Sequence, residues 1–179
     1  MTANNPHARQ RPINNPSLRD TNLFERMLTF ANSHRATSNV LHALETWVDD
    51  LDVPGYRWIR RRHPEYELTF GKSVRGQELE IYIDYSAKND FLGLYMYLPT
   101  LYERGAHTTV CELINKVNMD ATYGNLELNP DSGKLRYRFS IDVEGVRLTH
   151  VFLDFMLASG CSVFGKCMPE LLPGPKEAQ

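Results

Sequence analysis

The sequence predicts an α+β domain in which helices pack on one face of an antiparallel sheet. The hydrophobic periodicity changes from helical spacing in residues 37–52 to strict alternation in two later segments, and a third, largely apolar segment follows them. The links between these segments are too short for the crossover that parallel strands need, so the segments form an antiparallel meander. The three predicted strands are residues 65–71, 78–85 and 91–98.

Two helices are expected before the meander, each with one apolar face. Residues 22–34 place apolar side chains near helical spacing, and Asn22 and Glu25 have the spacing of a capping box. In residues 37–52 an apolar stripe runs along one face. A Pro-Gly pair shortly after this stripe ends the second helix.

A third helix and a β-hairpin are expected after the meander. Thr109 and Glu112 have capping-box spacing at the start of a segment with apolar residues at helical intervals. The chain then forms strands over about 121–129 and 134–143. The Asn-Pro-Asp-Ser-Gly sequence between them consists of residue types that favour turns, so the two strands form a hairpin.

The strand at 134–143 indicates which kind of sheet this is. Its apolar side chains alternate with Lys134, Arg136 and Arg138, which is typical of a sheet with one buried and one solvated face. A last amphipathic helix follows over about 150–167. The expected order of elements is therefore α-α-β-β-β-α-β-β-α, with the helices on the apolar face of the sheet.

The chain of 179 residues divides into four regions around one domain. Residues 1–20 are polar and rich in proline and asparagine, so they bury too little surface to offset their ordering entropy and form a disordered arm. Residues 21–36 form an extra N-terminal helix. Residues 37–172 form the single folded domain, and residues 173–179 form a loose tail.

Composition narrows the possible environments and partners. The net charge of −2 provides no general attraction for nucleic acid or for anionic lipid. By inspection no apolar run approaches the roughly 20 residues that span a bilayer, and the N-terminus has no apolar segment of a secretory signal. These features predict a cytoplasmic protein that does not bind a membrane.

Residue patterns for catalysis and cofactor binding are sparse. The six histidines are scattered over different elements, and no phosphate-binding glycine loop, nucleophile elbow or dinucleotide motif is present. His107 and Cys111, one helical turn apart, are the only pair that suggests a nucleophile, and all three cysteines are expected to be buried structural thiols. The sequence therefore predicts a protein that is not an enzyme and has no cofactor or metal.

The second half of the chain carries a family resemblance. The order of elements over residues 37–98 agrees with it, whereas residues 1–36 fall outside it. The residues that carry it are the helix VCELINKVN at 110–118 with its two asparagines, the hairpin at 123–139, Arg-Leu-Thr at 147–149 and Met-Pro-Glu-Leu at 168–171. On these grounds the chain resembles the YbjN family.

The resemblance implies a fold similar to that of type III secretion chaperones, often assembled as a homodimer that binds a protein client. The family is described as a regulator in sensory transduction or stress response. It has no agreed catalytic residues, so the resemblance implies no site. Fold similarity by itself does not establish function.

One predicted strand is apolar on both faces, which singles out a candidate contact surface. On strand 91–98, aromatic side chains lie on the face opposite the leucines, and Tyr82 on the preceding strand joins them. Two explanations of the pattern are equally good: helix 22–34 folds over this surface within one chain, or the surface is an interface with a client or a second protomer. In a third arrangement the helix is exchanged between protomers or displaced by a client. For an interface, the candidate residues are Tyr82, Phe91, Tyr95 and Tyr97.

A basic cluster offers an alternative function. Arginines beside a tryptophan can follow phosphates and stack a base, although a solvated loop or a docking patch for an acidic protein is favoured here. The leading hypothesis is a chaperone- or adaptor-like homodimer that holds a protein client in a stress or regulatory response; the alternative is nucleic-acid binding. The cluster comprises Arg57, Trp58, Arg60, Arg61 and Arg62.

Overall fold

The architecture of the chain comes from a computed structural model that describes residues 39–51, 57–59 and 65–172. The backbone alone is described at 57–59. The predicted arm, extra helix and tail, residues 1–20, 21–36 and 173–179, lie outside the described residues.

A six-stranded sheet forms the centre of the described part, and every neighbouring pair of strands is antiparallel. The strand order is β1-β2-β3-β4-β6-β5, so the hairpin joins the meander through the pairing of β6 with β4. The predicted α+β fold is confirmed, with the three-residue β1 as an addition. The strands are β1 (Arg57–Ile59), β2 (Glu65–Val74), β3 (Gln77–Ser86), β4 (Phe91–Leu101), β5 (Asn125–Leu128) and β6 (Lys134–Asp142).

The register places apolar side chains of successive strands opposite one another on one face. Ile83 on β3 lies opposite Leu68 on β2 and Leu94 on β4. Leu94 in turn lies opposite Phe139 on β6. All four side chains are buried. Because side chains alternate along a strand, this row places every second residue of these strands on the apolar face.

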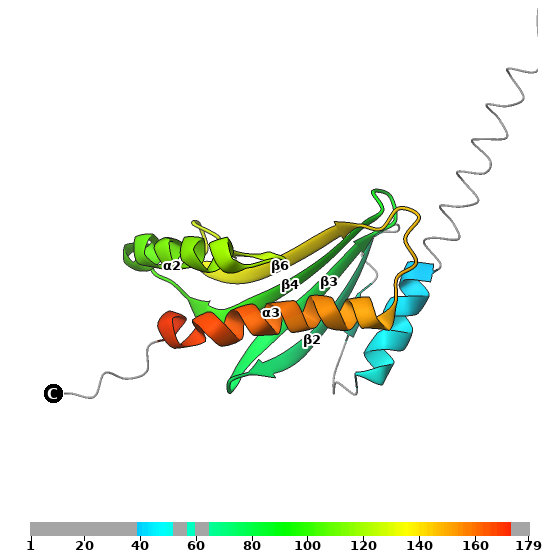
Figure 1. Ribbon diagram of the computed structural model, residues 1–179, viewed down its shortest axis with the longest axis horizontal. Helices are drawn as coiled ribbons and strands as arrows, with labels where there is room; N and C mark the ends of the chain where they lie inside the picture. Colours follow the sequence, from blue (N-terminus) through cyan, green and yellow to red (C-terminus); the bar gives the residue numbers. More distant parts are fainter. Residues whose placement is uncertain (1–38, 52–56, 60–64, 173–179) are drawn as a thin grey trace, which may run out of the picture.

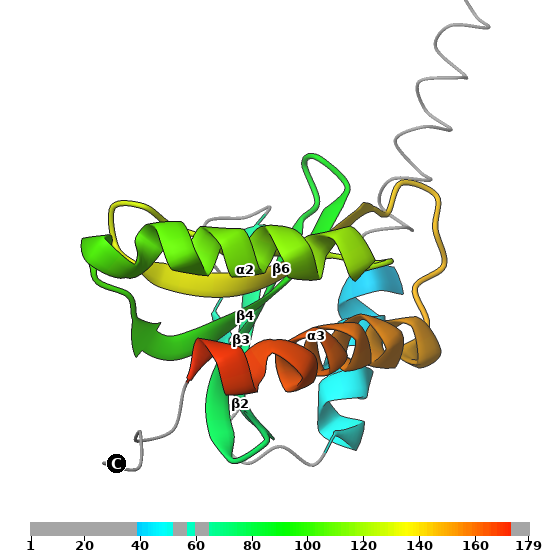
Figure 2. The same ribbon diagram turned by 60° about the vertical axis from the view of Figure 1, so that its left-hand side comes forward.

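The described helices lie on this apolar face (Figures 1 and 2). They are α2 (His107–Asp120), preceded by a short 3-10 turn, α3 (His150–Leu171) and a helix of residues 39–50. Trp47 of the first helix contacts Phe70 of β2 edge to face, with ring centroids 6.1 Å apart, and its Nε1 donates to Asp154 of α3 at 2.8 Å. This helix therefore packs against both the sheet and α3.

Helix α3 lies very close to the sheet because of Gly160. A Cβ at this position would lie 2.1 Å from the sulfur of Met96 and 2.8 Å from the ring of Tyr137. The side chain of Thr149 caps the helix by accepting a hydrogen bond from the Phe152 amide at 3.3 Å. The cap sets where α3 begins, and the glycine lets its middle approach the strands.

The composition of α3 corrects one expectation about membranes. By length and composition alone this 22-residue helix could span a bilayer, since an 18-residue stretch within it has a mean hydropathy of 1.4. The expectation that no segment approaches this limit is therefore wrong. Asp154, Lys166 and Glu170 are its only charged residues, and the exposed Val151 and Phe155 add to its hydropathy. Its inner face, including Leu153, Leu157 and Phe164, is buried within the core.

The cysteines also differ from expectation. Cys167 is buried and Cys161 is half-buried, but Cys111 is exposed. The buried residues of α2 are Val110 and Ile114, which lie one helical turn apart. Cys111 is rotated about 100° from Val110 around the helix axis, so it faces away from the core.

Candidate protein-binding surface on the open sheet face

The sheet face opposite the helices, here called the open face, has no cover from any described element (Figures 1 and 2). Tyr82, Tyr95 and Tyr97 lie on it, since each alternates with core residues of its own strand. Tyr82 is directly opposite Tyr95 on the neighbouring strand, and Glu80 is directly opposite Tyr97. All three tyrosines are half-buried, so part of each ring reaches the surface.

The open face is hollowed at these tyrosines. The hollow has a volume of about 640 Å³, and its lining includes all three tyrosines together with Glu80 and Arg136. Tyr82 and Tyr97 meet edge to face with ring centroids 5.3 Å apart, and the Tyr82 hydroxyl donates to Glu80 at 3.1 Å. We call this region the tyrosine hollow.

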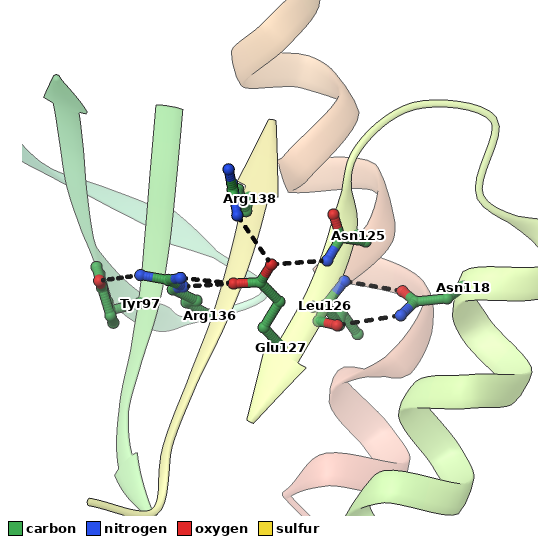
Figure 3. A network of polar contacts seen from close by, with 7 residues as sticks. All are labelled: Tyr97, Asn118, Asn125, Leu126, Glu127, Arg136 and Arg138. Atoms are coloured by element: carbon green, nitrogen blue, oxygen red, sulfur yellow. Dashed lines mark hydrogen bonds and ion pairs between the residues drawn. The ribbon is translucent and has the colours of Figure 1, made fainter. Parts of the chain in front are cut away.

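Arg136 on β6 forms one wall of the tyrosine hollow. Its guanidinium carbon lies 5.0 Å from the centroid of the Tyr95 ring, within the range of a cation–π contact. Its Nη1 donates to the Tyr97 hydroxyl at 3.1 Å. The same group forms an ion pair with Glu127 of β5, with 2.6 Å between Nη2 and Oε2 (Figure 3). The arginine therefore holds two tyrosine rings and one carboxylate in fixed relation.

Glu127 accepts contacts from three side chains at once. Besides Arg136, Asn125 donates to it at 3.1 Å and Arg138 lies 3.5 Å away (Figure 3). Partial burial by itself would raise the pKa of Glu127, but the hydrogen bonds from Asn125 and Arg136 and the arginine charges outweigh it and lower the pKa. The pKa of Arg136 is raised despite its own burial, because Tyr97 and Glu127 stabilise the charged form.

Phe91 extends the aromatic surface beyond the hollow. Between it and Tyr95 on β4 lies Gly93, which is buried although it is on the open face. A Cβ at Gly93 would lie 2.9 Å from the Tyr95 ring and 3.0 Å from the Phe91 ring. The two rings therefore fold over the glycine from both sides and form one continuous aromatic strip along β4.

A second apolar surface lies on the helix side of the molecule. Tyr123, between α2 and β5, stacks on Phe139 with centroids 6.1 Å apart and meets Phe155 of α3 edge to face at 4.8 Å. Phe152 is in contact with the same cluster. Tyr123 and Phe155 remain exposed, as does Val151 one helical turn away from Phe155.

Known proteins were compared with the chain at the levels of sequence and fold. No protein-family model and no curated protein matches it. Among solved structures, the crystal structure of YbjN from E. coli matches with a TM-score of 0.50 and 14% identity, over 73% of this chain and 92% of YbjN. A chain of the HopA1–SchA chaperone–effector complex matches with a TM-score of 0.50 and 13% identity, over 76% of this chain and 97% of that chain.

The chain has a YbjN-like, type III secretion chaperone-like fold. At these identities the comparison establishes the fold alone. The predicted resemblance is thus confirmed at the level of structure.

The YbjN-like fold brings most of the predicted surface residues together. Tyr82, Tyr95 and Tyr97 share the tyrosine hollow, and Phe91 lies next to it on the same face. Their role in binding stays a prediction, and the alternative cover, helix 22–34, lies outside the described residues.

The basic cluster is described only in part. In β1 the backbone of Arg57 pairs with Thr69 and that of Trp58 pairs with Leu68. The arginines at 60–62 lie outside the described residues, so the nucleic-acid prediction is not tested.

Two residues of the site were not singled out from the sequence: Arg136 and Glu127. The alternating basic residues of β6 indicated that Arg136 is on the solvated face. The pairing of β6 with β4 was needed to place it beside the tyrosines, which precede it by about 40 positions.

The suggested nucleophile pair does not form. The Nε2 atom of His107 lies 2.9 Å from the backbone oxygen of Tyr102, so this nitrogen is engaged by the backbone. Within the described residues, no group of three or more histidine, cysteine or acidic side chains is arranged to hold a metal ion.

Proposed function

We propose that this protein is a non-enzymatic binding module that holds a segment of a protein client on the open face of its sheet. The observation that carries the proposal is the tyrosine hollow: three half-buried tyrosines on a face that no described helix covers. Tyrosine suits protein interfaces because its ring buries apolar area while its hydroxyl stays hydrogen-bonded.

The contacts that hold the tyrosine rings in place indicate a surface that is preorganised for binding. Arg136 contacts Tyr95 and Tyr97 and is itself fixed by Glu127, so these rings are held before a client arrives. A surface ordered in advance loses less conformational entropy on association. One solved structure of similar fold is part of a chaperone–effector complex, which agrees with a chaperone-like role.

We further propose that the protein acts in the cytoplasm as a homodimer, in a stress or regulatory response. The exposed apolar surface on the helix side provides a contact for the second copy, since Val151 is 79% exposed and Phe155 is 37% exposed. A Val151→Glu/Phe155→Glu double variant would then be monomeric at concentrations where the wild type is dimeric. Light scattering after gel filtration measures this, and an unchanged mass would exclude this surface as the dimer contact.

Client binding is tested with a Tyr95→Glu/Tyr97→Glu double variant of the full chain. Partners recovered from lysate with the wild type are identified by mass spectrometry, purified, and titrated directly against both proteins. The variant is expected to lose most of the affinity, because it places two carboxylates in the hollow. Met119→Glu is the matched control, since it adds a charge at an apolar side chain that is 81% exposed on α2. Equal affinity for a folded double variant would show that the open face does not hold the client.

A further inference from the structure

We propose that the client segment held in the tyrosine hollow carries a basic side chain, arginine or lysine, beside an apolar one. This inference rests on the proposed function and specifies the chemistry of the partner. It comes from the distribution of charge around the tyrosines.

The charged and aromatic side chains of the hollow form an ordered row across the sheet. In the register, Glu80 of β3 is opposite Tyr97 of β4, which is opposite Arg136 of β6, which is opposite Glu127 of β5. Side chains directly opposite on neighbouring strands lie within contact distance. The row therefore begins with the carboxylate of Glu80 and continues through the Tyr97 ring. It ends with Arg136, which is already paired with the carboxylate of Glu127.

The two arginines at the β6 end of this row are already engaged, whereas Lys134, which also lines the hollow, forms no ion pair with a described residue. The guanidinium of Arg136 is occupied by Glu127 at 2.6 Å and by the Tyr97 hydroxyl at 3.1 Å, and it also lies over Tyr95. Arg138 lies 3.5 Å from the same carboxylate. An anion arriving here would have to compete with Glu127 for both arginines.

The β3 end is different, because its carboxylate forms no ion pair within the described part of the chain. Glu80 is exposed, and the contact found for it is the hydrogen bond from Tyr82. No described lysine or arginine lies within ion-pair distance of Glu80. Glu67 and Asp84 also line the hollow on this side. Burial raises the pKa of Tyr82 first, and the neighbouring Glu80 and Glu67 charges raise it further, as expected in a negative field.

The aromatic ring beside Glu80 completes a site for a cation. Tyr82 contacts Tyr97 with one ring edge-on to the other, and within the described residues no cation lies over the Tyr82 ring. A guanidinium or ammonium group placed between this ring and Glu80 gains a cation–π contact and an ion pair together. The protein's own Arg136 over Tyr95 is an example of the first contact on the same surface.

The test uses the full chain as bait for a phage library of random peptides at physiological salt. Selected peptides are expected to be enriched in arginine or lysine next to aromatic or aliphatic residues. The best peptide is then synthesised with a fluorescent label and titrated by anisotropy. Glu80→Gln is expected to weaken its binding by about fivefold, as the loss of a partly exposed ion pair predicts. The substitution keeps an oxygen that accepts the Tyr82 hydrogen bond.

Glu112→Gln is the matched control, since Glu112 is also exposed but lies on α2, on the other side of the sheet. Its peptide affinity should equal that of the wild type. Selected peptides that are acidic or uncharged, or an equal affinity for Glu80→Gln, would overturn the inference. The proposed function would survive that result if the peptides still lost binding to Tyr95→Glu/Tyr97→Glu. Failure to select any peptide that depends on these tyrosines would overturn both.

Discussion

The side-chain amide of Asn118 holds both backbone polar groups of Leu126. Its Nδ2 donates to the Leu126 carbonyl at 3.0 Å, and its Oδ1 accepts from the Leu126 amide at 2.8 Å (Figure 3). Leu126 lies in β5, the last strand at one edge of the sheet. An unpaired edge is a template for another strand, and here a helix side chain occupies the positions that a further strand would use.

Asn118→Ala should therefore lower the free energy of unfolding by about 1–3 kcal/mol, because it removes the partners of two partly buried backbone groups. Urea denaturation followed by circular dichroism measures the change. Asn115→Ala on the same helix is the control: Asn115 is exposed, and its substitution should change stability by less than about 0.5 kcal/mol. Equal effects of the two substitutions would show that the Asn118 bonds do not stabilise the edge.

Replacing each of two glycines of α3 with alanine should change the stability of the protein in opposite directions. Gly160→Ala should destabilise the protein by about 1–3 kcal/mol, because the new methyl group meets Met96 and the Tyr137 ring in the packed core. At Gly165 a Cβ would lie 3.7 Å from its nearest neighbour, Arg75, which is an ordinary contact. Gly165→Ala should therefore stabilise the helix by up to about 1 kcal/mol. Thermal unfolding of the two variants tests the close approach of α3, and a stabilising Gly160→Ala would contradict it.

The ion pair of Glu127 should make part of the stability depend on pH. Its folded pKa lies below the ordinary value of 4.5, so its contribution is fully present above that value and is lost as the pH falls through the lower, folded pKa. The stability difference between wild type and Glu127→Gln should be constant near neutral pH and should shrink below about pH 4.5. Urea titrations across this range measure it. A difference that grew on acidification would be inconsistent with the lowered pKa.

The thiols should react in the order of their exposure. Burial raises the pKa of Cys167 to about 11, and the side chain is 1% exposed. At about pH 8 roughly one in a thousand of these thiols is ionised, so alkylation is slow for two reasons. Iodoacetamide should modify the exposed Cys111 first, as followed by peptide mass spectrometry. Equally fast modification of Cys167 would mean that α3 does not stay packed on the sheet.

Much of the fold follows from local patterns in the sequence. Alternation assigned Ile81, Ile83 and Tyr85 to one face of their strand, and the structure buries all three. The turn residues between β5 and β6 predicted that hairpin. Local patterns failed where the three-dimensional surroundings decided the outcome, as for the exposure of Cys111.

For the candidate site, local patterns predicted the tyrosines but not their contacts with Arg136. The alternation of β4 placed Tyr95 and Tyr97 on the face opposite the core, because each strand carries its own two-residue period. Nothing within β4 or β6 indicates that the two strands pair, since Arg136 follows Tyr97 by 39 positions.

By itself, the sequence determined the elements, their amphipathic faces and the antiparallel meander, because these depend on the spacing of residues a few positions apart. Only the tertiary structure decided that β6 lies beside β4, that Arg136 closes the tyrosine hollow and that Asn118 seals the edge at Leu126. These contacts join segments distant in sequence, and their formation depends on how the core packs as a whole.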